Sequence, residues 1–141
     1  MHTYHYPRPA VTVDAILISN RNSVLLIERG REPFLGKWAL PGGFIDMDEE
    51  LDQACRREVE EETGLKVGEM KQFRAFGGVN RDPRHRTISV LFYTFLENEP
   101  IPLAGDDAAK AQWFPVGQLP ELAFDHANIL EEFKAEVLKH I

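Results

Sequence analysis

Glu58, Glu61 and Glu62 are spaced so that their carboxylates can act together. They stand at positions i, i+3 and i+4, which places side chains within one turn of an α-helix. Three like charges that are held close together either take up protons or bind a counter-charge. A hard divalent cation such as Mg²⁺ suits such a cluster, because it prefers oxygen ligands from a few carboxylates and keeps sites for water and phosphate. The alternative interpretation is a solvated acidic face of a helix.

The helix that must carry these glutamates is expected at residues 50–63. With Leu51 as the reference and a rotation of about 100° per residue, Glu58 and Glu62 lie within about 20° of the centre of the stripe that should face the core. Glu60 points to the opposite side, where a charge is readily solvated. Carboxylates at positions that call for apolar side chains strengthen the case for a functional site, with the solvated face still open.

Two neighbours could support the cluster. The carbonyl of Gly43 could supply a further oxygen ligand. Arg57 is the cation next to the glutamates, and we predict that it pairs with Glu49 or Glu61 and holds the carboxylates in one orientation. The alternative is an ordinary surface ion pair, which contributes little to stability.

The remaining elements predict an α/β fold. Apolar, β-branched runs separated by a turn indicate a β-hairpin, and further strands alternate with two amphipathic helices, which suggests a mixed sheet covered on its faces. The pair Gly42-Gly43 predicts a tight turn or a close approach of the backbone. The expected elements are a hairpin at 10–19 and 24–28, strands at 67–77, 87–96 and 109–114, a second helix at 125–139, caps for the first helix at Asp46 and Asp48, and its end at Gly64.

Composition restricts the class of protein. The chain has 141 residues, which fits one domain (1–141) with a short N-terminal arm at about 1–9. The net charge of −7, from 16 Lys+Arg and 23 Asp+Glu, argues against binding to long nucleic acid. A single cysteine, Cys55, excludes an internal disulfide and is expected to be a structural thiol. Without an apolar leader or an 18-residue apolar run, we expect a cytoplasmic protein that contacts no membrane.

Residues 43–65 spell a specific pattern: Gly43, five residues, Glu49, seven residues, and then Arg57-Glu58-Val59-Glu60-Glu61-Glu62-Thr63-Gly64-Leu65. This pattern resembles the Nudix box at every fixed position, and the order of the elements resembles the Nudix fold, an α/β/α sandwich with a mixed β-sheet. Segments 80–84, 105–109 and 122–126 resemble a bacterial and archaeal branch whose members are described as ADP-ribose pyrophosphatases or as sensor domains of regulators of NAD metabolism.

The resemblance implies metal-dependent hydrolysis of a nucleoside diphosphate linked to another group, with ADP-ribose as the favoured substrate and AMP and ribose 5-phosphate as products. It assigns metal binding to Glu58, Glu61 and Glu62 with the Gly43 carbonyl, orientation to Arg57 and Glu49, Mg²⁺ or Mn²⁺ as the cofactor, and a homodimer as the assembly. One alternative is a nucleoside or pterin triphosphate pyrophosphatase. Another is a sensor module that binds ADP-ribose or a nucleotide without cleaving it.

The proton acceptor is open between a glutamate of the box, Glu58 or Glu61, and an acid of a distant loop. Asp107 and its neighbour Asp106 are the loop candidates, with surface acids in a turn as the alternative. Glu97 and Glu99 are less favoured.

A binding site for the substrate needs cations that contact its phosphates and an aromatic ring that stacks on adenine. Arg29, Arg81 and Arg84 are the candidates for phosphate, because guanidinium groups bind it through two hydrogen bonds. Phe34 is the main candidate for stacking on the base, and Trp38 and Phe76 are also available, although Trp38 fits a core position. His126 either caps the last helix or faces the pocket, and we expect the cap.

Overall fold

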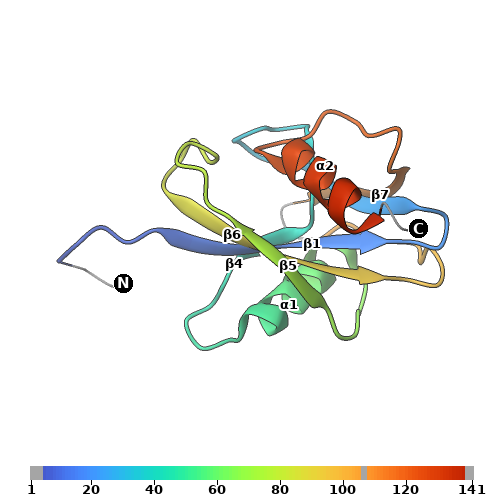
Figure 1. Cartoon of the computed structure of the whole chain (residues 1–141), viewed down its shortest axis with the longest axis horizontal. Helices are drawn as coiled ribbons and strands as arrows, with labels where there is room; N and C mark the ends of the chain where they lie inside the picture. Colours follow the sequence, from blue (N-terminus) through green and yellow to red (C-terminus); the bar gives the residue numbers. More distant parts are fainter. Residues whose placement is uncertain (1–4, 106–107, 139–141) are drawn as a thin grey trace.

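The computed structural model describes residues 5–105 and 108–138 and contains one seven-stranded mixed sheet with a helix on each face (Figure 1). This is the predicted three-layer arrangement. The elements in chain order are β1 (Ala10–Ile18), β2 (Ser23–Arg29), β3 (Trp38–Ala39), β4 (Gly42–Phe44), α1 (Leu51–Thr63), β5 (Lys71–Phe76), β6 (Thr87–Phe95), β7 (Ala108–Pro115) and α2 (His126–Glu136).

Strand β1 lies at the centre of the sheet, whose order is β3-β2-β1-β6-β5. It pairs with β6 in parallel along its whole length and with β4 antiparallel at residues 12–14. The predicted hairpin is confirmed next to its turn, where Ile18 pairs with Val24. Strand β2 pairs with β7 along its whole length, from Ser23 to Arg29, whereas β1 pairs with β6.

Both faces of β1 are buried, which explains why its sequence is almost continuously apolar. Val13, Ala15 and Leu17 point to the α1 side, where they pack with apolar residues of that helix. Ile16 and Ile18 point to the α2 side. In Figure 1 the two helices lie on opposite sides of the sheet. Within the described residues, neither helix is long and apolar enough to cross a membrane.

The helix α1 begins one residue after Glu50, whose backbone N–H donates to Oε1 of Gln53 in a capping box. The prediction that Asp46 or Asp48 caps this helix is therefore wrong. The predicted end at Gly64 is confirmed, because this glycine adopts a left-handed conformation (φ 74°) and its N–H donates to the carbonyl of Glu60.

Strand β4 is missing from the sequence prediction, which expected a tight turn or a close approach of the backbone at Gly42-Gly43, and the close approach is confirmed. The strand forms because these glycines allow an unusually close approach to β1. A Cβ atom at Gly42 would collide with the Asp14 carboxylate and the Val13 carbonyl. Strand β5 begins at Lys71, four residues later than predicted, whereas the strands at residues 87–96 and 109–114 and the second helix occur close to the predicted bounds.

Replacement of Phe133 by alanine should destabilise the fold strongly. Phe133 is fully buried on α2, with its ring centroid 5.3 Å from that of Phe73 and 5.2 Å from that of Tyr93. The cavity left behind should lower the free energy of unfolding by about 3–5 kcal/mol in urea titrations. The exposed Glu131→Ala variant of the same helix is the control and should change it by less than about 0.5 kcal/mol. Equal effects of the two variants would contradict this placement of α2.

Candidate active site

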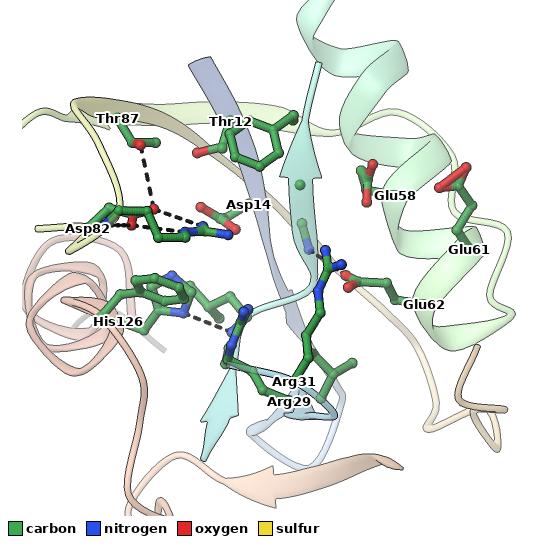
Figure 2. A pocket seen from close by; sticks show the side chains of 18 of the residues that line it. Thr12, Asp14, Arg29, Arg31, Glu58, Glu61, Glu62, Asp82, Thr87 and His126 are labelled. Carbon is green, nitrogen blue, oxygen red and sulfur yellow. Dashed lines mark hydrogen bonds and ion pairs between the residues drawn. The ribbon is translucent and has the colours of Figure 1, made fainter. Parts of the chain in front are cut away.

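A cavity of about 270 Å³ opens between α1, β4, the 78–86 loop and the start of α2. Its volume is near the lower end of the range of roughly 300–1,000 Å³ that is typical of small-molecule sites. Figure 2 shows the three glutamates of α1 on one side, Asp82 and His126 on the opposite side, and Asp14 between them. The two sides differ in chemistry, because acids of α1 face a wall that carries arginines, aromatic rings and a histidine.

The glutamates of α1 differ in burial, as the helical pattern predicts. Glu62 is buried and its Oε1 accepts a hydrogen bond of 2.8 Å from the N–H of Gly42. The side chain of Glu58 is 14% exposed and that of Glu61 is 40% exposed. Burial, together with the nearby charges of Glu58 and Asp14, raises the pKa of Glu62 to about 8, although the hydrogen bond from Gly42 acts in the opposite direction. A negative charge on Glu62 is therefore costly at this wall of the cavity.

Arg57 lies among the carboxylates and donates hydrogen bonds to three of them. Its Nη2 is 2.7 Å from Oε1 of Glu49, and its Nη1 is 2.8 Å from Oε1 of Glu58 and 3.0 Å from Oε2 of Glu61. The predicted pairing with Glu49 or Glu61 is confirmed for both partners. Hydrogen bonds from Arg57 lower the pKa of Glu49, so this acid stays charged and anchors the guanidinium.

The donor set on this wall fits a divalent cation. Carboxylate and carbonyl oxygens are the ligands that Mg²⁺ and Mn²⁺ accept. A Cβ atom at Gly43 would lie 2.5 Å from Oε2 of Glu58, so the backbone of β4 is pressed against this carboxylate. Among residues 5–105 and 108–138, no three acidic, histidine or cysteine side chains are already gathered into a metal-binding group.

The predicted phosphate-binding arginines all line the cavity, but they differ in how they are held. Arg81 is 5% exposed and donates two hydrogen bonds, of 2.9 and 2.7 Å, to Asp125. Arg29 donates from Nε to the Pro33 carbonyl at 2.7 Å. Burial and the charge of Arg84 lower the pKa of Arg29. A contact of each arginine with phosphate stays a prediction.

Arg84 lies between two aromatic rings that the sequence analysis missed. Its guanidinium carbon is 5.7 Å from the ring centroid of Phe44 and 5.8 Å from that of Phe124. Asp82 fixes it through hydrogen bonds of 3.1 and 2.9 Å. Both rings line the cavity, and each lies in a segment without a regular pattern, so only the proximity of Phe44 to the Gly-Gly pair could have indicated it.

Phe34, the predicted stacking residue, is not among the residues that line the cavity. It packs edge-on against Phe124, with 4.8 Å between the ring centroids, and so supports a cavity residue from behind. Trp38 packs against Phe114 in the core, as expected for this position, and Phe76 is also a core residue.

His126 faces the cavity, and the expectation that it caps α2 is wrong. The N-cap is Asp125, and His126 is the first residue of the helix. Its Nδ1 accepts a hydrogen bond of 3.0 Å from the backbone N–H of Leu40. Burial lowers the pKa of His126, so the ring is neutral and links α2 to the segment between β3 and β4.

Asp14 is a second cavity residue that the sequence analysis missed. It is buried in the middle of β1 and accepts a short hydrogen bond from the hydroxyl of Ser89. The available signal was one charged residue inside the run Ala10-Val11-Thr12-Val13-Asp14-Ala15-Ile16-Leu17-Ile18. A strand that is buried on both faces has no solvated side for such a charge.

The other acids and the thiol are placed as follows. Asp106 and Asp107 lie outside the described residues. Glu99 accepts a hydrogen bond of 2.7 Å from the Ser19 hydroxyl, and neither it nor Glu97 lines the cavity. Cys55 is fully buried in the α1 core, where burial raises the pKa of its thiol, consistent with a structural role.

Comparison with known proteins gives a family match over residues 8–133, to the NUDIX domain. A protein named ADP-ribose pyrophosphatase from Methanocaldococcus jannaschii is 41% identical over 128 residues, which are 91% of this chain and 75% of that protein. An ADPR responsive transcriptional repressor, NtrR, from Acinetobacter baylyi is 31% identical, and the match spans 90% of this chain and 54% of the repressor. The NUDIX domain of Shewanella oneidensis NrtR, solved with ADP ribose, superposes with a TM-score of 0.86 at 31% identity and covers 94% of this chain and 90% of that one. These matches confirm the predicted fold.

The buried His126 should make stability depend on pH. Its pKa is lower in the folded protein than the ordinary value of 6.5, so the unfolded chain binds more protons below that pH and stability falls as pH falls. The free energy of unfolding should drop by about 1 kcal/mol between about pH 6.5 and 5.5 through this group. In urea titrations the His126→Asn variant, which keeps an acceptor for the N–H of Leu40, should lack this component. A wild type and a variant with identical pH dependence would contradict it.

Proposed function

We infer that this chain, which belongs to the NUDIX family and is a Nudix pyrophosphohydrolase, cleaves the diphosphate of ADP-ribose with the help of a divalent metal ion. The observation that carries the substrate proposal is the two-sided cavity. One side presents the glutamates of α1, and the other presents arginines and aromatic rings that suit a nucleotide. The relatives that are named for ADP-ribose support the same substrate.

We assign the metal to Glu58, Glu61 and Glu62, with the Gly43 carbonyl as a further ligand. The support is the convergence of these acids on one wall of the cavity and the raised pKa of Glu62, which a cation would lower again. A bound divalent ion supplies charge that screens the diphosphate and lowers the pKa of a coordinated water. Mg²⁺ is the proposed ion, with Mn²⁺ as the alternative.

The other residues of the site bind the substrate or hold neighbouring side chains in place. Arg57, anchored by Glu49, keeps the carboxylates of Glu58 and Glu61 in place. Arg29 and Arg84 are suited to hold phosphate oxygens, because both line the cavity and guanidinium groups bind phosphate bidentately. Arg81 has an indirect role, because its two hydrogen bonds fix Asp125 at the start of α2.

Adenine would stack on Phe44 or Phe124 next to the guanidinium of Arg84. Both rings offer an apolar surface beside a cation, an arrangement that binds the π-system of a base.

In the proposed reaction, water attacks one phosphorus and the bond from that phosphorus to the bridging oxygen breaks. The products are AMP and ribose 5-phosphate. A carboxylate must accept the proton of the water. Glu61 and Glu58 are candidates from the box, and Asp107 stays a candidate from the loop that precedes β7.

A sensor is the second candidate function, and the similarity to the ADPR responsive repressor supports it. This chain spans about half the length of that repressor, and it keeps every acid of the box. The intact acids favour catalysis over binding alone. The homodimer and the cytoplasmic location stay predictions, and size measurement by light scattering would test the first.

A substrate panel separates the candidate functions. The purified protein with Mg²⁺ or Mn²⁺ should release AMP from ADP-ribose and should act poorly on nucleoside triphosphates, measured by chromatography of the products. Turnover of a triphosphate with release of pyrophosphate, and none of ADP-ribose, would favour the runner-up enzyme. Binding of ADP-ribose without any product would establish the sensor.

Removing one charge from the acidic wall should abolish most turnover. Glu61→Gln and Glu62→Gln should each lower kcat for ADP-ribose by about 10²-fold or more, the size expected when a catalytic charge is lost. The matched control is Glu60→Gln, which changes an exposed glutamate of the same helix that does not line the cavity. The control should keep kcat within about twofold. Unchanged turnover in the first two variants would remove these residues from the mechanism.

A further inference from the structure

Asp14 is a buried acid that the proposed chemistry leaves without a role. It is 8% exposed, lies in the central strand of the sheet, and still lines the cavity. Within the described part of the chain it forms no ion pair, and its hydrogen bond comes from the neutral hydroxyl of Ser89. Burying a carboxylate without a cation is costly unless its oxygens are hydrogen-bonded. Such a position suggests that Asp14 has a role in binding the ligand of the cavity.

The surroundings hold this carboxylate in one place. Ser89 on β6 is fully buried, does not line the cavity, and donates to Oδ2 from behind. Gly42 on β4 packs so close that any side chain there would collide with Oδ1. The remaining lone pairs of a carboxylate can only accept hydrogen bonds, so Asp14 presents fixed acceptors to the cavity.

Charge decides which part of a substrate can lie over Asp14. A phosphate there would meet an anion with no cation paired to it, whereas the acids that contact Arg57 or Arg84 are already compensated. A neutral donor group is favourable at the same place. The vicinal hydroxyls of a ribose are such donors, and a carboxylate accepts from them in many nucleotide sites.

The position of Asp14 in the cavity indicates that the adenosine ribose is the part of the substrate that lies next to it. Asp14 lies between the glutamates and the side with Asp82 and His126 (Figure 2). Arg84 is bonded to Asp82, and Phe124 lies 5.5 Å from His126 between ring centroids, so the proposed base site is on that side. With the diphosphate at the glutamates and adenine at the rings, the sugar that joins them is the ribose of the adenosine.

We propose that Asp14, positioned by Ser89, accepts hydrogen bonds from the 2′- and 3′-hydroxyls of the adenosine ribose and thereby makes the enzyme selective for ribonucleotides. The inference rests on the proposed function, since it takes the diphosphate and the base to lie where that function puts them. It also predicts rejection of a 2′-phosphate, because this group would place negative charge against the carboxylate.

The test compares two substrates in four proteins. The substrates are ADP-ribose and its analogue with 2′-deoxyadenosine, and the proteins are the wild type, Asp14→Ala, Ser89→Ala and the control Ser19→Ala. Ser19 also donates its hydroxyl to a carboxylate, that of Glu99, and lies five residues along the chain from Asp14, roughly 16 Å away in an extended strand. kcat and KM are measured for each pair.

The wild type and Ser19→Ala should prefer ADP-ribose by roughly 10-fold to 100-fold in kcat/KM, the size of one hydrogen bond to a charged group. In Asp14→Ala the preference should fall to about unity, because removing the hydroxyl costs nothing once its acceptor is gone. In Asp14→Ala the KM for ADP-ribose should rise, whereas the KM for the deoxy analogue should change little. The preference of Ser89→Ala for ADP-ribose should lie between those of the wild type and Asp14→Ala. An ADP-ribose with a 2′-phosphate should be cleaved better by Asp14→Ala than by the wild type.

Two results would overturn the proposal. One is an equal loss for both substrates in Asp14→Ala, mainly in kcat, which would place Asp14 in the metal site or in the fold. The other is a wild type that cleaves both substrates equally well. Failure of the wild type to cleave ADP-ribose at all is a different result, because it would refute the proposed function itself.

Discussion

The structure depends on acids that occupy the buried side of a helix. On α1 the positions of Glu58 and Glu62 continue the stripe that packs Ala54 and Cys55 into the core. Charges there are stable only with specific partners, and the chain supplies Arg57 for Glu58 and the N–H of Gly42 for Glu62. Gly43 follows from this constraint, because a side chain there would collide with Glu58, and a side chain at Gly42 would collide with Asp14 of β1.

The sequence contains enough information to predict α1 and its acids, because helical periodicity is local and one turn fixes which side chains converge. It also predicts most of the strand pattern, since β1 and β2 are largely apolar. The cavity wall opposite α1 could not be predicted in the same way. Phe124 and Arg84 meet there only because the 78–86 loop and the start of α2 lie next to each other in space. Phe34 was selected by residue type, but in the structure it packs against Phe124 and does not line the cavity.

The division of the cavity has a functional meaning. The glutamate wall provides chemistry that every family member with an intact box can share, whereas Asp14, Arg84 and Phe124 lie on elements outside the box. Selectivity can therefore change through these residues without loss of the hydrolytic wall. A binding module and an enzyme can share the nucleotide side for the same reason, and the acids of α1 distinguish them.

The central claim is that the acids of α1 gather a divalent ion. The most direct measurement is a titration of the protein with Mn²⁺ followed by electron paramagnetic resonance, in the wild type and in a Glu58→Gln/Glu62→Gln double variant. The account predicts saturable binding in the wild type, tightened by a non-hydrolysable ADP-ribose analogue and lost in the variant. Equal binding by the two proteins, or none by the wild type with the analogue present, would contradict it.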